Sequence, residues 1–238
     1  MKTFRDFLSE QCAWSVGWNG AMISVLDNPR LVLADLANAE VVDRLMGDLQ
    51  KITAESFGAE LDTGTDDGVR NHVVNSGTIA FLHDRDKILG FASSKLFPEE
   101  EVFFLHGVAT ARSSKCRGVG KKLIHTLSNM AGMKRIAFTT QNPIMFCLLR
   151  SLCTRVYPQP EHPKVPAKFK KFGHKLVADR PGSMDPDSFV ITGLYGRCLY
   201  DEIPDSYDKT VNQWFQTTLK VEDGLTSNGF LFIGEDGW

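Results

Sequence analysis

The stretch Lys115-Cys116-Arg117-Gly118-Val119-Gly120-Lys121 decides the fold, because it joins a predicted strand to a predicted helix. Glycines at such a junction let the backbone approach a ligand closely, and the first N–H groups of a helix have no partner within it. With the helix dipole, these groups form an anion site suited to a pyrophosphate, to which Arg117 and Lys121 add positive charge. The stretch therefore predicts a loop that binds a phosphorylated ligand.

Two common phosphate-binding patterns do not fit this spacing. A P-loop ending in Gly120-Lys121 needs Gly at position 115 and Ser or Thr at position 122, but lysine stands at both. A dinucleotide-binding fingerprint needs Gly or Ala three residues after Gly120, where the chain has Leu123. The strand before the loop also belongs to a predicted antiparallel meander, which is not part of a βαβ unit.

Hydrophobic periodicity predicts the elements on both sides of the loop. Before it come three strands joined by tight turns, at 78–83, 88–97 and 101–110. After it come a helix over 117–130, a strand over 134–140 and a helix over 143–153 that has Pro143 in its first turn. The helix over 117–130 has one apolar face, made of Leu123, Ile124, Leu127 and Met130.

The flanking segments give coarser predictions. Residues 1–28 contain no element that can be assigned, 31–35 is a candidate first strand, 40–57 predicts one or two helices, and 58–77 is predicted to be mostly loop. Six of the ten prolines fall in 154–188. Beyond residue 157 we expect a helix over 166–175, a strand over 189–195, a helix over 205–219 and a last strand over 229–234.

The element order over 78–153, with the pattern [R/Q]-x-x-G-x-[G/A] opening a helix, resembles the GCN5-related N-acetyltransferase (GNAT) superfamily. The resemblance implies an α+β fold with a mixed, mostly antiparallel twisted sheet flanked by helices. It also implies acetyl-CoA as co-substrate and no metal. The coenzyme A pyrophosphate would lie on Lys115, Cys116, Arg117, Gly118, Val119, Gly120 and Lys121.

Further site residues follow from the same resemblance. Backbone amides around Gly107 and Val108 would pair with the pantetheine arm and polarise the thioester carbonyl. Asn142 stands where the family often has an Asn that contacts this arm or the phosphates. The chain departs from the family at Lys115, where Arg or Gln is usual, and in two extra residues between Val108 and Lys115.

A third departure leaves the acid unassigned, because Leu149 stands where the family often has a Tyr that protonates the departing thiolate. The candidate acids are Cys153, Tyr157 and Tyr195, and Tyr157 is preferred because it follows the Asn142 helix directly. For each of these residues the alternative is a core side chain without a chemical role.

Direct transfer to an amine also requires a base for the ammonium proton. His106 is the preferred base or water-relay candidate, on the same strand face as Val102 and Phe104. The alternative is a histidine packed under a loop and bonded to one carbonyl. Glu99, Glu100 and Glu101 are carboxylate substitutes for the base, or else a solvated edge.

Composition narrows the class of protein. The 238 residues carry a formal net charge of −2, which does not suit a nucleic-acid binder. The five cysteines are scattered without a C-x-x-C pair, so neither a disulfide framework nor a zinc site is expected. No signal-peptide h-region and no stretch of membrane-spanning length is seen, so we expect a cytoplasmic protein that does not bind membranes.

The expected organisation is a single acyltransferase domain over 1–238, with a core at about 30–156. Residues 157–238 would complete the sheet and cover the acceptor side, which favours a small-molecule amine as acceptor. A peptide N-terminus and a protein lysine remain alternatives, as do a homodimer and a catalytically weak acyl-CoA-binding module. The lysines at 164–175 would reach the adenosine 3′-phosphate of coenzyme A or an acidic acceptor, or else form the polar face of a helix.

Overall fold

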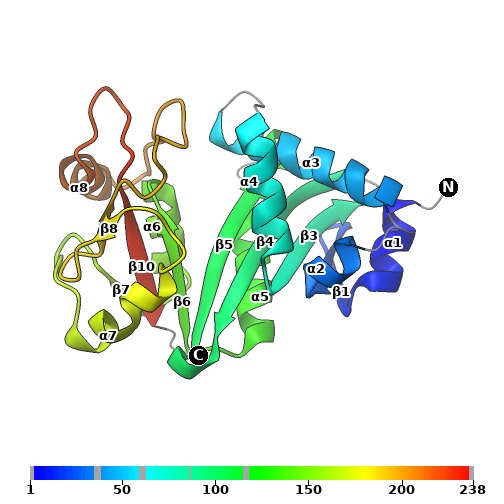
Figure 1. Cartoon of the computed structure of the whole chain (residues 1–238), viewed down its shortest axis with the longest axis horizontal. Helices are drawn as coiled ribbons and strands as arrows, with labels where there is room; N and C mark the ends of the chain where they lie inside the picture. The colour runs from blue at the N-terminus through cyan, green and yellow to red at the C-terminus, as the bar shows by residue number, and fades with distance from the viewer. Residues whose placement is uncertain (1–2, 35–38, 59–62, 86, 115–117, 236–238) are drawn as a thin grey trace. The chain divides into compact units, whose positions relative to one another are not determined.

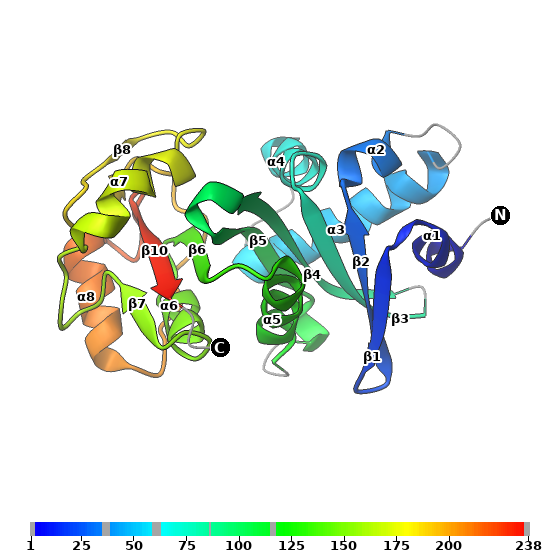
Figure 2. The same ribbon diagram turned by 90° about the horizontal axis from the view of Figure 1, so that it is seen from below.

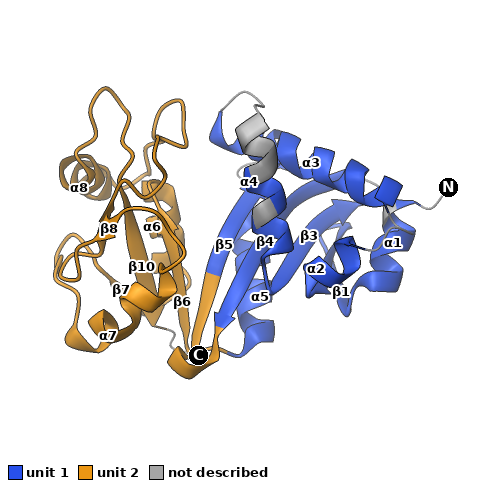
Figure 3. Ribbon diagram, in the orientation of Figure 1, with its two compact units in different colours: residues 1–96, 105–132 blue, residues 97–104, 133–238 orange. Residues whose placement is uncertain are grey.

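The computed structural model (Figures 1 and 2) describes residues 3–34, 39–58, 63–85, 87–114 and 118–235. The chain forms two compact units, coloured separately in Figure 3. Unit 1 comprises residues 1–96 and 105–132, and unit 2 comprises 97–104 and 133–238. Strand β5 (Val102–Thr110) contributes to both. The predicted single domain with a core at 30–156 stays a prediction.

Unit 1 is built on strands β1 (Trp14–Trp18), β2 (Ala21–Asp27), β3 (Thr78–Asp84), β4 (Lys87–Phe97) and β5, in that spatial order. The first four pair antiparallel, with Ser24 opposite Phe81 and Phe81 opposite Phe91. The meander predicted from residue 78 onward is confirmed.

The helices of unit 1 are α1 (Phe4–Gln11), α2 (Pro29–Leu33), α3 (Ala39–Phe57), α4 (Thr63–Val74) and α5 (Val119–Ala131). Helices α3 and α4 cover one face of the unit 1 sheet and α5 covers the other (Figures 1 and 2). Helix α3 buries Val41, Leu45, Leu49 and Ile52, whose helical spacing puts them on one stripe. These side chains pack with Phe81 and Phe91 in one cluster.

Two predictions for unit 1 are wrong. Residues 31–33 belong to helix α2, which begins with Pro29 after Asn28 in a left-handed conformation, and do not form a strand. The Gly- and Asp-rich segment 58–77 contains helix α4, because Val69 and Val73 lie four residues apart and both enter the core. Met130, predicted on the apolar face of α5 with Leu123, Ile124 and Leu127, lies at the exposed end of this face and is 44% exposed.

Unit 2 continues from the first half of β5 through β6 (Arg135–Thr140), β10 (Gly229–Glu235), β9 (Val190–Thr192) and β8 (Ser183–Met184), with β7 (Arg155–Tyr157) beside β10. Val102–Phe104 pair in parallel with Arg135–Ala137, whereas β6 and β10 pair antiparallel. Strand β9 is shorter than the predicted 189–195, and β7 was not predicted. The predicted α+β class with a mostly antiparallel sheet flanked by helices is confirmed.

The α-helices in the described part of unit 2 are α6 (Pro143–Arg150), α7 (Ala167–Leu176) and α8 (Lys209–Leu219). Phe169 and Leu176 of α7 pack with Val102 and Phe104 in one cluster. A second, aromatic group includes Trp214, whose ring stacks on Phe230 at a centroid distance of 4.6 Å. No helix in the described part of the chain is long and apolar enough to cross a membrane.

Candidate functional site

The N-terminus of α5 is the described part of the predicted anion loop. Gly118 is the N-cap residue, with φ +73° and no side-chain capping bond. This left-handed conformation favours glycine, and a Cβ there would have nothing within 4 Å. Within α5, the Lys122 N–H donates a helical bond to the Gly118 carbonyl at 2.9 Å. The N–H groups in the first turn of a helix generally point out of its N-terminus, toward any bound anion.

Close packing holds this helix end against the sheet. A Cβ on Gly90 of β4 would come within 3.0 Å of the Ala109 carbonyl oxygen and 3.1 Å of a Val119 methyl. Gly90 therefore allows α5 to begin directly against β4 and β5, and the sequence pattern did not single it out. A Cβ on Gly120 would lie 3.7 Å from a Val108 methyl, which is ordinary contact.

Three of the predicted loop residues, Lys115, Cys116 and Arg117, lie outside the described residues. Val119 is buried at the start of α5, and Lys121 lies in its first turn. Gly107 and Val108 lie on β5, beyond the residues that pair with β6, since the register of that pair ends at Phe104 opposite Ala137.

His106, the predicted base, is half-buried on β5. Its ring lies 4.4 Å from the ring of His72, measured between centroids, with an interplanar angle of 43°. His72 comes from α4, and the sequence pattern did not point to it because that segment was predicted to be a loop. The spacing of Val69 and Val73 was the signal that would have found the helix.

The carboxylates at the start of β5 form ion pairs within unit 2. Lys175 of α7 lies 2.8 Å from Glu99 and 2.6 Å from Glu100, and Lys134 lies 2.5 Å from Glu101. Hydrogen bonds from Lys175 and Lys134 lower the pKa values of Glu99 and Glu101 respectively. A lowered pKa makes a carboxylate a weaker base, which favours the solvated-edge interpretation.

The lysines of α7 are also paired within unit 2. Lys168 lies 2.6 Å from Glu235, and Lys170 contacts Asp187. With Lys175, three of these cations have acidic partners, as expected for the polar face of a helix.

Asn142 lies at the end of β6 and caps α6. Its Oδ1 accepts a hydrogen bond of 2.8 Å from the Ile144 N–H, and its Nδ2 donates one of 3.2 Å to the Tyr200 hydroxyl. Burial raises the pKa of Tyr200, which keeps this phenol protonated. The sequence pattern did not single out Tyr200, which lies 58 residues from Asn142.

The other candidate acids have different surroundings. Tyr157 is half-buried on β7, with its ring 5.0 Å from that of Phe169. Tyr195 donates its hydroxyl hydrogen to Thr139 Oγ1 at 3.1 Å, and burial raises its pKa. Leu149, at the position where a Tyr was expected, is 0% exposed. His106 belongs to unit 1, and all of these candidates belong to unit 2.

Residues 46–143 match the family model described as the acetyltransferase (GNAT) family. This segment is a GNAT acetyltransferase domain. The domain contains α5 with its opening glycines, all of β5 and β6, and Asn142. Tyr157 and the rest of the C-terminal region follow it. The GNAT resemblance predicted over 78–153 is thereby confirmed.

The solved structures that resemble this chain include three acetyltransferases. The aminoglycoside 6′-N-acetyltransferase from Enterococcus faecium is 16% identical, with 49% of this chain and 61% of that chain covered, at a TM-score of 0.37. The ribosomal-protein-S18-alanine N-acetyltransferase from Escherichia coli is 8% identical, with 91% of this chain and 95% of that chain covered, at a TM-score of 0.48.

The third is diaminobutyrate acetyltransferase EctA from Paenibacillus lautus, in complex with L-2,4-diaminobutyric acid and coenzyme A. It is 15% identical, with 91% of this chain and 96% of that chain covered, at a TM-score of 0.43. This chain spans less than two thirds of the length of the Enterococcus faecium enzyme. No curated protein has significant sequence similarity to this chain.

Proposed function

We propose that this chain is an acetyl-CoA-dependent N-acetyltransferase that transfers the acetyl group directly to an amine of a small molecule. The observation that carries the proposal is the uncapped start of α5 at Gly118, inside the segment that matches the GNAT family. A helix start without a side-chain cap keeps its N–H groups available to an anion. The open space around the Gly118 Cα is compatible with a bulky phosphate group there.

Several elements contribute to the proposed binding of the cofactor. The α5 N-terminus with Gly118, Val119, Gly120 and Lys121 would bind the pyrophosphate, together with Lys115, Cys116 and Arg117. Backbone amides at Gly107 and Val108 and the side chain of Asn142 would orient the pantetheine arm. Bound acetyl-CoA supplies a thioester that an amine can attack and a thiolate that leaves.

Proton transfers complete the proposed reaction. His106 would accept the ammonium proton directly or through water, with the His72 ring 4.4 Å away holding its orientation. Tyr157 is the proposed proton donor for the thiolate. Tyr200 is a second candidate for this role, because its hydroxyl contacts Asn142. Burial raises the pKa of Tyr200, which keeps the proton on the phenol and makes it a weaker acid.

The acceptor class is part of the proposal. The region after residue 157 adds α7, α8 and three strands to unit 2, more chain than a minimal member of the family needs. We infer that this region restricts the acceptor side and favours a small amine over a peptide or a protein lysine. The odd number of scattered cysteines supports a cytoplasmic location.

The test is release of free coenzyme A thiol from acetyl-CoA, followed with a thiol-reactive dye in the presence of a panel of amines. We expect thiol release that depends on an amine from the small-molecule part of the panel. Release only with peptides or protein lysines would overturn the acceptor class.

A second function, an acyl-CoA-binding module without turnover, is favoured by one observation. Leu149 is fully buried where an acid is expected, so the acid at that position is lost. In that case acetyl-CoA would raise the melting temperature while no amine in the panel released thiol. Binding and turnover measured on the same preparation distinguish the two functions.

A further inference from the structure

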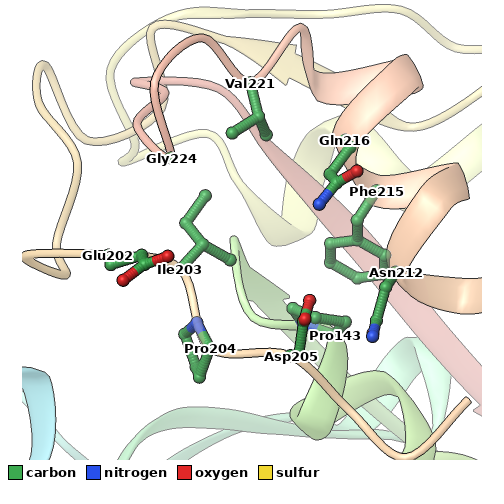
Figure 4. A pocket seen from close by; sticks show the side chains of 10 residues that line it. All are labelled: Pro143, Glu202, Ile203, Pro204, Asp205, Asn212, Phe215, Gln216, Val221 and Gly224. Carbon is green, nitrogen blue, oxygen red and sulfur yellow. The ribbon is translucent and has the colours of Figure 1, made fainter. Parts of the chain in front are cut away.

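Unit 2 contains a cavity of about 300 Å³ between the start of α6, the segment 202–205 and the face of α8 (Figure 4). Its apolar wall consists of Pro143, Ile203, Phe215 and Val221. A cavity of this size is at the lower end of the range of small-molecule sites, so it suits a ligand of few atoms.

Hydrogen bonds fix the wall formed by 202–205 at both ends. On one side, the fully buried Gln141 accepts from the Leu199 N–H at 3.0 Å and donates to the Thr226 carbonyl at 2.6 Å. On the other side, the Ser206 N–H and hydroxyl both donate to Asn212 Oδ1, at 2.9 and 2.6 Å. The Ile203 N–H bonds the Gly224 carbonyl at 3.3 Å across the cavity mouth. The pocket is therefore formed before any ligand binds.

Three polar side chains remain available to a ligand. Figure 4 shows the Asp205 carboxylate and the Gln216 amide projecting toward the open centre, with the Glu202 carboxylate beside Ile203. Among the described residues, neither Glu202 nor Asp205 has an ion-pair partner within 4.0 Å. The pocket thus offers two carboxylates without an ion-pair partner among the described residues, an amide group and an apolar wall.

This combination is complementary to one kind of ligand. An ammonium group would satisfy the carboxylates, while a short alkyl chain would cover Phe215 and Val221. A phosphate or carboxylate ligand would be repelled by Glu202 and Asp205. We propose that this pocket is a binding site for a small aliphatic ammonium ion. The proposal does not depend on acetyl transfer.

The test is titration of the full chain with butylammonium chloride, followed by two-dimensional amide NMR. We expect saturable shifts that include the amides of Ile203, Gln216 and Val221, with a Kd of about 1–10 mM for so small a ligand. 1-Butanol, the neutral analogue, should bind at least about fivefold more weakly, and sodium butyrate should not bind. Equal shifts with butanol, or no saturable shifts with butylammonium, would overturn the proposal.

Variants separate the two carboxylates from general charge effects. The double variant Glu202→Gln and Asp205→Asn should weaken butylammonium binding about tenfold, because both side chains are exposed and each ion pair is modest. The matched double variant Glu161→Gln and Asp201→Asn removes the same charge from exposed positions outside the pocket lining and should bind like the parent.

Both double variants should melt within a few degrees of the parent, since all four side chains are exposed. If the pocket variant bound butylammonium as tightly as the parent, the carboxylates would not form a cation site. Equal weakening in the control variant would also overturn the proposal, since net charge alone would then explain the effect.

Discussion

The side-chain amide of Asn142 donates a hydrogen bond of 3.2 Å to the hydroxyl of Tyr200. The same amide group caps α6 through its oxygen, so one side chain connects a helix start to a segment 58 residues away. This relationship places a half-buried tyrosine beside the residue that the GNAT resemblance assigns to coenzyme A. It also means that a substitution at Asn142 affects the fold as well as the site.

Replacing Tyr200 with Phe removes the acceptor of this bond. We expect a loss of about 0.5–1.5 kcal/mol in the free energy of unfolding, measured by urea denaturation. The control is Tyr207→Phe, whose side chain is 88% exposed and should leave the stability unchanged. If Tyr200 also protonates the thiolate, kcat should fall in Y200F while acetyl-CoA affinity stays. A Tyr200→Phe variant as stable as Tyr207→Phe would show that the hydrogen bond contributes nothing.

Asn142→Ala should have two separable effects. Loss of the cap on the Ile144 N–H should destabilise the fold by about 1 kcal/mol, and loss of the amide donor should weaken coenzyme A binding about two- to tenfold. Asn142→Asp keeps a capping oxygen but replaces the amide donor with a negative charge, so it should retain stability and lose affinity. Measurement of melting temperature and of coenzyme A affinity by calorimetry distinguishes the effects. Unchanged affinity in both variants would leave Asn142 as a helix cap alone.

The space around Gly120 allows a sharp test of the anion loop. Since a Cβ at this position makes ordinary contacts, Gly120→Ala should fold like the parent. Gly120→Glu should abolish acetyl-CoA binding, because the longer side chain adds bulk and negative charge where the pyrophosphate is expected. Circular dichroism checks the fold of both variants, and calorimetry measures their affinity for acetyl-CoA. Parent-like affinity in a folded Gly120→Glu variant would remove the basis of the proposed site.

His106→Ala should lower kcat with nearly unchanged acetyl-CoA affinity, because the expected cofactor contacts at Gly107 and Val108 are backbone amides. In the parent, kcat/KM should rise with pH as the catalytic base loses its proton. The His106→Ala variant should lose this rise of kcat/KM with pH. Because the acceptor amine also titrates, the comparison requires the same amine for both proteins. An identical pH profile and rate would assign His106 a packing role.

The thiol of Cys12 should be unreactive at neutral pH. Burial, with a smaller contribution from the charge of Asp27, raises its pKa to about 12. At pH 8 only about one molecule in 10⁴ would carry the reactive thiolate, so iodoacetamide should not modify Cys12 until the chain is denatured in urea. Mass spectrometry of labelled peptides measures this directly, and rapid labelling of Cys12 in the folded chain would contradict it.

The same shift predicts a pH dependence of stability. Because the folded chain binds the Cys12 proton more tightly than the unfolded chain, the associated stability is fully present below about pH 8.5. It should be lost as the pH rises toward 12, through the folded pKa of this thiol. Cys12→Ser should therefore reduce the fall in melting temperature between pH 8.5 and 11, which differential scanning calorimetry can follow.

The sequence by itself determined the strand–strand–strand–loop–helix–strand–helix order over residues 78–153. Alternating and helical hydrophobic patterns are local properties, as is the need for glycine where α5 begins at φ +73°. The GNAT assignment followed from this order and from the glycine spacing, so local patterns were sufficient for it. The ion pairs of Glu99 and Glu101 also fit the predicted solvated edge, whereas the side chain of Glu100 is only 12% exposed.

Only the tertiary structure decided the rest. Helix α4 forms in a Gly- and Asp-rich segment because Val69 and Val73 enter the core, and this burial outweighs the weak local propensity. The contacts of His72 with His106, and of Asn142 with Tyr200, join residues far apart in the chain, and no local pattern encodes them. The ammonium pocket depends likewise on Gln141 and Asn212 fixing the segments around 202–205, because a cavity exists only between packed elements.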